Sequence, residues 1–291
     1  MKKTRPFVLA VSLLVASAAP LVAGEGGDTL RVMSFNVRLG VADDGENSWE
    51  QRKALLARTV QDFDPDLLGT QETWRFQASY LLQQLPGREY VGWPRQPGNE
   101  KDGEECGILF RAARFEKLDA GQFWLSETPE VPASKSWDSS LPRVVTWVRL
   151  RDRQRPDAEL VFLNTHFDHR GAEARRESAR LLRGRLPRLA PSGVWILTGD
   201  FNCGDDSPPY QVLVGEEGLA VVDSYRALHP ERRDDEGTFS GFRGRRSGPR
   251  IDWVLHGSAF ETLSAVIDRT EEQGRNPSDH YPVNAVLRWA R

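Results

Sequence analysis

The 291-residue sequence has little cysteine, no internal repeat and no low-complexity segment. Its two cysteines, Cys106 and Cys203, cannot form the thiolate cluster of a soft-metal site. In an exported protein they could pair, or they could remain buried thiols. A Gly-x-Ser-x-Gly turn that presents a nucleophilic serine is also missing. We therefore expect chemistry without a covalent intermediate on serine or cysteine.

Long hydrophobic runs are confined to the first two dozen residues. The basic segment 1–6 precedes the apolar run FVLAVSLLVASAA (7–19), and small residues follow. This is the pattern of a secretory signal peptide, and the run is shorter than the roughly 20 residues that span a bilayer. We expect residues 1–24 to be a leader, cleaved between residues 18 and 24, and the mature protein to be periplasmic or secreted without integral membrane association. An uncleaved membrane anchor is the alternative.

Positive charge is not in excess. The formal net charge at pH 7 is −3, and removing Lys2, Lys3 and Arg5 with the leader gives −3 − 3 = −6. A net acidic protein does not attract a nucleic-acid duplex through its whole surface. The loop FRGRRSGPR (242–250) concentrates four arginines. It could attract a polyanion locally, or it could be an ordinary solvated charge run.

Strand-like segments outnumber helix-like ones. Helices are predicted at 49–63, where Ser48 and Gln51 fit a capping box, at 75–85 and at 172–186. Alternating or short apolar runs predict strands at 29–37, 66–72, 107–111, 144–150, 159–167, 194–202, 250–257 and 280–289. Several successive strands lack an intervening helix, which argues against a doubly wound parallel sheet and favours sheet packed on sheet. We expect one monomeric α+β domain from residue 28 to 291.

Polar side chains recur where these strands end or begin. Residues two apart on a strand share a face, so pairs such as Asp200 and Asn202 should point the same way. Carboxylates that apolar neighbours partly bury need a cation or a donor. Together with Asn and His, they favour a hard ion such as Mg²⁺, or Mn²⁺. The residues are Asn36, Gln71, Glu72, Asn164, His166, Asp200, Asn202, Asp252, Asp279 and His280.

Six fragments that contain these residues resemble the endonuclease/exonuclease/phosphatase family, whose members hydrolyse phosphate esters with a metal ion. They occur in the family's order and cover nearly all of the chain after the leader. The similarity extends to exported bacterial members with the NTHFDH (164–169) and FWLSETP (123–129) stretches. The resemblance implies a four-layer α/β sandwich: two mixed β-sheets packed face to face, helices on both outer faces, and a site at one rim. The fragments are MSFNVR, LLGTQE, FLNTHFDH, ILTGDFN, RIDWVL and SDHYPV.

The resemblance also implies a metal site. Glu72 should be a direct ligand with Asn36 beside it, and Asp279 should contact the ion directly or through water. A solvated strand end is the alternative for Glu72, and an Asx turn is the alternative for Asn36.

By the same resemblance, Asp200 should orient or deprotonate the attacking water, and Asn202 should donate to a phosphoryl oxygen. A plain turn is the alternative for both. Asp252 should hold the imidazole of His280 in one tautomer. The family leaves two roles open for His280, either a general base or a charged clamp on the phosphate.

The remaining candidates surround the phosphate. His166 should face it as a donor or proton source, and Asn164, hydrogen-bonded nearby, should help to bind the phosphate. Arg143 is an anion-binding candidate because a guanidinium matches phosphate geometry. Three further residues should support those that touch the substrate, namely Asp168, His169 and Gln71. The alternative is that they are ordinary polar residues of loops. Glu104 and Glu105 are candidates for the edge of the site.

These roles describe in-line hydrolysis of a phosphate mono- or diester by water that Asp200 and a divalent ion activate. We favour a phospholipid, a sugar phosphate or an inositol phosphate as substrate, and an exported nuclease is the alternative. A non-catalytic binding protein would have lost some of these side chains. A glycosidase needs paired carboxylates but not the accompanying Asn and His set.

Overall fold

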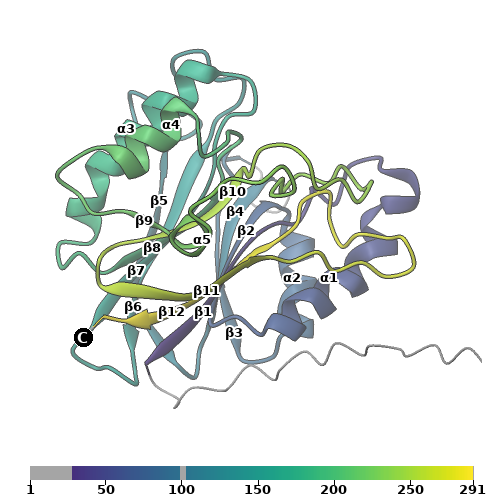
Figure 1. Ribbon diagram of the computed structural model, residues 1–291, viewed down its shortest axis with the longest axis horizontal. Helices are drawn as coiled ribbons and strands as arrows, with labels where there is room; N and C mark the ends of the chain where they lie inside the picture. Colours follow the sequence, from purple (N-terminus) through teal and green to yellow (C-terminus); the bar gives the residue numbers. More distant parts are fainter. Residues whose placement is uncertain (1–27, 99–102, 291) are drawn as a thin grey trace, which may run out of the picture.

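The computed structural model describes residues 28–98 and 103–290, and its core is two six-stranded sheets (Figure 1). The expected leader at residues 1–24 lies outside the described residues. The first sheet has the order β11 (Phe260–Ile267), β12 (Val283–Trp289), β1 (Thr29–Asn36), β2 (Leu67–Thr73), β4 (Glu105–Arg111) and β3 (Arg88–Val91). The second has the order β5 (Phe115–Trp124), β6 (Val144–Asp152), β7 (Glu159–His166), β8 (Trp195–Asp200), β10 (Asp252–His256) and β9 (Val222–Asp223).

Strand direction explains why polar groups stand at strand ends and starts. Strands β1 and β2 run parallel, as do β7 and β8, so the carboxyl ends of each pair lie together. Strands β10 and β12 run antiparallel to β8 and β1, so each begins where its neighbour ends. Asp252 is accordingly paired with Asp200 in the register of the second sheet. Both sheets are mixed, as the family resemblance implied.

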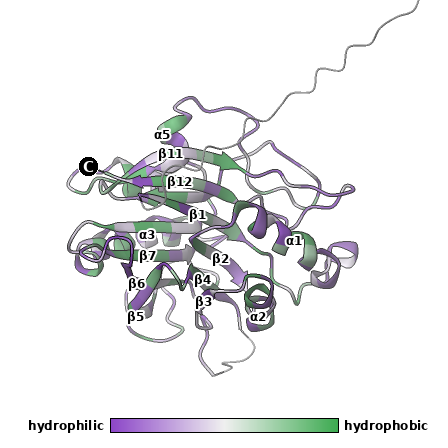
Figure 2. Cartoon of the chain, turned by 90° about the horizontal axis from the view of Figure 1, so that it is seen from below, coloured by the Kyte–Doolittle hydropathy of each residue, from purple (hydrophilic) through white to green (hydrophobic). Residues whose placement is uncertain are grey.

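Helices cover the outer faces of both sheets (Figure 1). Helices α1 (Trp49–Phe63) and α2 (Arg75–Gln84) pack on the first sheet, and α3 (Ala172–Leu189) packs on the second. In Figure 2, α1 carries both hydrophilic and hydrophobic residues, as a helix with one buried side should. The predicted four layers are therefore present. The short elements are η1 (Gly45–Asn47), α4 (Pro208–Tyr210), η2 (Gln211–Gly215) and α5 (Ser224–Leu228).

Adjacent residues on the central strands face two different cores. Val32 and Phe162 lie in the core between the sheets. Met33 lies in the core under α1 and α2, and Leu163 lies in the core under α3. Because both faces of these strands are buried, their sequences are nearly continuous apolar runs, which made them recognisable.

Some local expectations were wrong. Ser48 precedes α1, but its side chain makes no capping hydrogen bond; instead the Gln51 backbone N–H donates to the Ser48 carbonyl. Of the two alternatives left open for Cys106 and Cys203, the structure shows free thiols and not a disulfide. Strands β3, β5, β9 and β11 were not predicted. Among the described residues, no helix has the length and apolar character to cross a membrane.

Candidate active site

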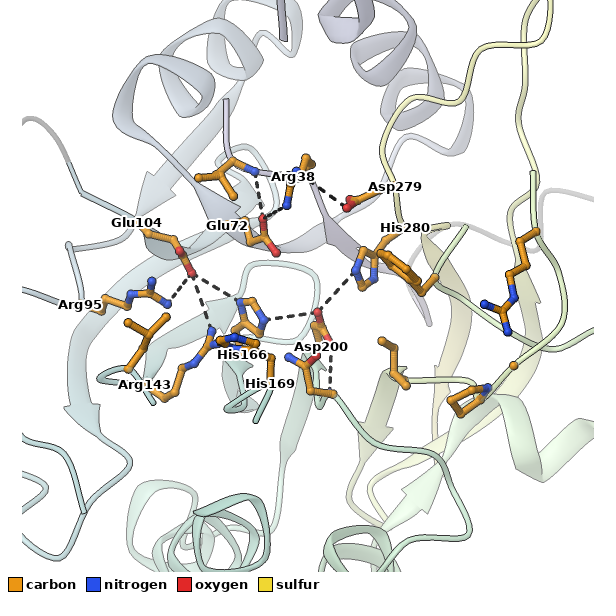
Figure 3. Close-up of a pocket in the computed structure, with 18 of the residues that line it drawn as sticks. Arg38, Glu72, Arg95, Glu104, Arg143, His166, His169, Asp200, Asp279 and His280 are labelled. Atoms are coloured by element: carbon orange, nitrogen blue, oxygen red, sulfur yellow. Dashed lines mark hydrogen bonds and ion pairs between the residues drawn. The ribbon is translucent and has the colours of Figure 1, made fainter. Parts of the chain in front are cut away.

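A cavity of about 620 Å³ opens at the rim where the strand ends of both sheets meet. Glu72 from β2, His166 from β7 and Asp200 from β8 line it, with Asp279 and His280 from the segment before β12. Figure 3 shows Arg95, Glu104 and Arg143 grouped on one side of Asp200, with Glu72, Asp279 and His280 on the others. The cavity therefore has an acidic part and a basic part.

A β-bulge turns Glu72 into the cavity. The pairing of β2 with β4 shifts register between Thr70 and Thr73, and Glu72 has a φ of +58°. Such a bulge re-aims a side chain that strand alternation would send elsewhere. Arg38 and Asn202, which also line the cavity, have φ values of +55° and +51°. Positive φ is uncommon for residues other than glycine, so three cavity residues carry backbone strain of the kind found at functional sites.

Asn36 connects the acidic side chains of the two sheets. It is fully buried at the end of β1, and its Nδ2 donates to Glu72 Oε1 and to Asp200 Oδ2, each over 3.0 Å. Its Oδ1 accepts from the Arg38 backbone N–H. The structure thus brings Asn36, Glu72 and Asp200 together from segments far apart in the sequence.

His280 is paired with a carboxylate of the opposite sheet. Its Nδ1 lies 2.9 Å from Asp252 Oδ2, and its Nε2 lies 3.8 Å from Asp200 Oδ2. Burial lowers the pKa of His280, but the charges of Asp252 and Asp200 outweigh burial and raise the pKa well above its usual value. These charges therefore favour the imidazolium form of His280, whose Nε2 faces Asp200.

His166 lies on the other side of the same Asp200 carboxylate and has the opposite protonation state. Its Nε2 is 3.4 Å from Asp200 Oδ2, and its Nδ1 is 3.5 Å from Glu104 Oε1. Burial and the charge of Arg143 lower the pKa of His166 to about 3. Burial and Asp252 raise the pKa of Asp200. Two histidines with pKa values pushed apart around one carboxylate are an arrangement suited to proton transfer.

Glu104 joins the basic side chains. Its Oε1 lies 2.7 Å from Arg95 Nη1 and 3.9 Å from Arg143 Nη1. Arg143 is 4% exposed, and its Nη2 lies 2.9 Å from His169 Nδ1. Within the described part of the chain, the Nε and Nη1 of Arg143 have no hydrogen-bond partner. Buried donors without partners are costly, so this arrangement suits an anionic group of a ligand.

The acidic part offers two candidate places for a divalent cation, one at Asp200, Asp252 and His280 and one at Glu72 and Asp279. Donor atoms of Asp200, Asp252 and His280 lie within 4.8 Å of one another, and Asp252 Oδ1 is buried without a partner among the described residues. Asp279 adds a carboxylate beside Glu72, and burial together with Glu72 raises its pKa. Oxygen donors with excess negative charge match a hard ion.

Asn164 does not reach the cavity, contrary to the expectation that it contacts phosphate. It is fully buried, and its Nδ2 donates to the carbonyls of Thr70 and Gly107, each over 2.8 Å. Its Oδ1 accepts from Gln71 Nε2 over 2.7 Å. Asn164 shares a face with His166 but lies two residues, about 7 Å, deeper along the strand. Asn164 and Gln71 therefore connect the two sheets beneath the site.

Asp168 holds a loop beside the cavity. Its carboxylate accepts from Ser140 N over 3.0 Å and from Gly171 N over 2.7 Å. It also lies 3.6 Å from Arg143 Nε. Burial raises the pKa of Asp168, but the Gly171 N–H and the other donors outweigh burial and hold the pKa well below its usual value. Asp168 therefore helps to position Arg143, which in turn contacts His169.

Several cavity residues had no sequence-based role. The Nε of Arg38 lies 3.8 Å from Asp279 Oδ2, and its Nη1 lies 3.9 Å from Glu72 Oε2. It stands two residues after Asn36 in a recognised fragment, so proximity to that fragment could have signalled it. Arg95 and Phe239 lie in loops without periodicity, and no sequence signal marked them. Arg245 belongs to the loop 242–250, whose arginines were one candidate for attracting a polyanion.

Residues 33–280 match the Endonuclease/Exonuclease/phosphatase family. Protein angel of Drosophila melanogaster is 29% identical over 82% of this chain and 72% of its own length. Nocturnin of the same species is 25% identical over 88% of this chain, which spans 46% of that protein. Two solved structures from Bacteroides thetaiotaomicron are similar. An endonuclease/exonuclease/phosphatase family protein has a TM-score of 0.81 and 33% identity, covering 90% of this chain and 98% of its own. A mannosyl-6-phosphatase has a TM-score of 0.79 and 34% identity, covering 89% and 99%.

Proposed function

We propose that this chain, which belongs to the Endonuclease/Exonuclease/phosphatase family and is a metal-dependent hydrolase of phosphate esters, removes phosphate from a small hydroxylated molecule such as a sugar phosphate. One observation carries the proposal. A single cavity combines the carboxylates Glu72 and Asp279 with the guanidinium of Arg143, whose Nε and Nη1 have no hydrogen-bond partner among the described residues. A cation and an anion-binding group on either side of Asp200 suit a phosphoryl group between them.

We assign the divalent cation, Mg²⁺ with Mn²⁺ as the alternative, to Glu72, Asp279 and the neighbouring Asn36. When bound there, it supplies Lewis-acid neutralisation of charge on the phosphoryl oxygens. The group formed by Asp200, Asp252 and His280 is less suitable. Its His280 Nδ1 already donates to Asp252, and metal ligation requires an unprotonated imidazole.

Asp200 takes the proton of the attacking water in this proposal. Its raised pKa makes the carboxylate a better base, and its Oδ1 is held by the Asn202 backbone N–H over 3.0 Å. The Asn202 Nδ2 uses one N–H on the Phe167 carbonyl and keeps the second for a phosphoryl oxygen. His280 clamps the phosphoryl group as an imidazolium. His166, which is neutral, donates an N–H hydrogen bond to the leaving-group oxygen, and that oxygen takes its proton from solvent.

The substrate class has two supports. The net charge of −3 does not favour a nucleic-acid duplex. A mannosyl-6-phosphatase is among the structurally similar proteins that share more than 30% identity with this chain. The arginines of residues 242–250, of which Arg245 lines the cavity, favour single-stranded nucleic acid as the second candidate.

We also propose that the enzyme works outside the cytoplasm, on the basis of the leader pattern at residues 1–24. Expression of the full chain in a bacterium, followed by fractionation and N-terminal sequencing, tests this. A first residue between 19 and 25 in the periplasmic or medium fraction is expected. An intact Met1 in the cytoplasmic fraction contradicts it.

Phosphate release is to be measured with mannose 6-phosphate, glucose 6-phosphate and inositol phosphate, beside bis-p-nitrophenyl phosphate and single-stranded DNA. Each reaction is run with Mg²⁺ and with EDTA, using wild type, Asp200→Asn and the control Asp268→Asn. We expect a sugar or inositol monoester to be the best substrate and EDTA to abolish its turnover. Dominant DNA cleavage assigns a nuclease instead. No turnover of any substrate in this panel contradicts the proposed substrate class.

A further inference from the structure

Arg52 of α1 is fully buried, and backbone carbonyls are its hydrogen-bond partners. Its Nη1 donates to the carbonyls of Val37 over 2.7 Å and Pro277 over 3.1 Å. Its Nη2 donates to the Arg38 carbonyl over 2.9 Å, and its Nε to the Asn47 carbonyl over 3.1 Å. One planar guanidinium therefore fixes four carbonyl groups from three separate segments.

Two of these segments carry the residues assigned to the cation. Val37 and Arg38 follow Asn36 directly, and Pro277 stands two residues before Asp279. A second contact joins the same segments, because the Ser278 Oγ donates to the Asn36 carbonyl over 2.6 Å. The end of β1 and the approach to β12, more than 200 residues apart in sequence, are thus held at a fixed separation by Arg52 and Ser278.

The guanidinium is held in an unusual electrostatic environment. No carboxylate of the described residues lies within ion-pair distance of it, and a buried charge without such a partner is costly. Its guanidinium carbon lies 5.3 Å from the ring centre of Trp49 and 5.7 Å from that of Phe242. Burial lowers the pKa of Arg52 to about 10, so it remains charged at neutral pH. The burial of this charge next to the cavity suggests that Arg52 has a role in the active site.

We propose that Arg52 is a positioning residue for the cation site: it sets the separation between Asn36 and Asp279 by clamping the backbone beside each. The inference rests on the proposed assignment of the cation to Glu72, Asn36 and Asp279. Arg52 touches neither substrate nor cation. Its effect is on how closely the ligands match the geometry that a divalent ion requires, and supporting residues of this kind typically change metal affinity 10- to 100-fold.

Arg183 of α3 provides a matched control. It is also a buried arginine that binds backbone carbonyls, with Nη1 on Leu213 over 2.6 Å and Nη2 on Glu217 over 3.1 Å and Leu219 over 3.0 Å. None of these residues lines the cavity. Arg52→Lys and Arg183→Lys both keep the charge and lose the planar fork. They should therefore cost similar stability while differing in their effect on the cation.

The experiment is calorimetric titration of substrate-free protein with Mn²⁺, accompanied by thermal unfolding. Arg52→Lys is expected to weaken Mn²⁺ binding about 10-fold or more, and Arg183→Lys to leave it within about twofold of wild type. Ser278→Ala, a smaller change to the same connection, is expected to weaken Mn²⁺ binding without unfolding the protein. Ser278 Oγ also lies 3.3 Å from Asp279 Oδ1, so weaker binding in Ser278→Ala supports the proposal only beside a loss in Arg52→Lys, whereas unchanged binding overturns it even if Arg52→Lys does not fold.

Three outcomes overturn the proposal. Equal Mn²⁺ affinities in the two lysine variants show that Arg52 is merely structural. Unchanged affinity in Ser278→Ala shows that the separation of the two segments does not control binding. Tighter Mn²⁺ binding in Arg52→Met shows that Arg52 acts through its charge, because removing a positive charge should favour a cation. Absence of Mn²⁺ binding by wild type would instead reject the proposed function itself.

Discussion

The imidazole of His280 and the carboxylate of Asp252 lie 2.9 Å apart, although one precedes a strand of the first sheet and the other begins a strand of the second. Asn36 and Asp200 form a second contact of this kind, over 3.0 Å. Both contacts cross from sheet to sheet at one rim. The site therefore exists only when the two sheets are packed in the observed register, which couples its geometry to the folded core.

Asp252→Asn is expected to lower the pKa of His280, because the asparagine keeps a hydrogen-bonding group but removes the negative charge. If His280 acts as an imidazolium clamp, activity is lost as pH rises through its pKa. The alkaline limb of the kcat/KM profile should then move to lower pH. If His280 acts as a neutral base, the acid limb should move to lower pH instead. A pH profile of Asp252→Asn beside Asp268→Asn distinguishes the two roles.

Asp200→Asn is expected to reduce kcat by about 10²–10⁴-fold, the usual contribution of a general base. The melting temperature should stay equal or rise, because a buried carboxylate next to Asp252 loses its unfavourable charge. Turnover of a p-nitrophenyl phosphoester and thermal unfolding by circular dichroism test the two halves separately. A variant with lost activity and a large fall in melting temperature would show that Asp200 is structural.

Strands could be predicted from the sequence where burial gives them a clear apolar pattern. Strand β8 is buried along its whole length and was recognised. Strands β5 and β11 are at sheet edges and expose alternate residues such as Lys117, Asp119 and Glu261, so their apolar pattern is too weak to recognise. Tertiary packing, which local sequence does not encode, decides these cases.

The site was predictable where a residue belongs to a fragment with fixed strand position. Strand spacing correctly placed Asn164 on the same face as His166, but it did not show how far Asn164 lies below the rim. The hydrogen bond of Asn164 to the Thr70 carbonyl was therefore not predicted. Arg95 lines the cavity and lies 2.7 Å from Glu104, and no local sequence pattern marks this contact. Glu72 reaches it because of a bulge, and that backbone conformation has no signature in the local residues.

Asp168→Asn is expected to lower the unfolding free energy at pH 7 by about 2–4 kcal/mol, because donors from two loops lose a charged acceptor. The pKa of Asp168 is depressed in the folded state. Its contribution is therefore present above the unfolded pKa of about 3.9 and is lost as pH falls toward the folded pKa. Urea unfolding at pH 7 and pH 3 should show the gap between wild type and variant narrowing at pH 3. A constant gap contradicts the account.

Arg250 supports the cavity wall from inside the protein. It is 1% exposed, and its Nη2 donates to Asp205 Oδ2 over 3.0 Å and also to Asp223 Oδ2. Asp205 in turn accepts from Arg226 over 2.6 Å. Pro249 and Ile251, on either side of Arg250, line the cavity. The ion pairs therefore hold the backbone that forms this wall.

Arg250→Met is expected to lower the unfolding free energy by about 3–5 kcal/mol, because Asp205 and Asp223 remain buried with one cation fewer. Arg288→Met removes an ion pair at the surface, with Glu261, and should cost less than about 1 kcal/mol. Arg250→Met should also raise KM for the substrate, because the cavity wall at Pro249 and Ile251 loses its support. It should lower kcat less, because Asp200 and His280 keep their own contacts. Urea unfolding and steady-state kinetics below the melting transition test this. Equal losses in kcat and kcat/KM with unchanged KM would show that the wall does not contact the substrate.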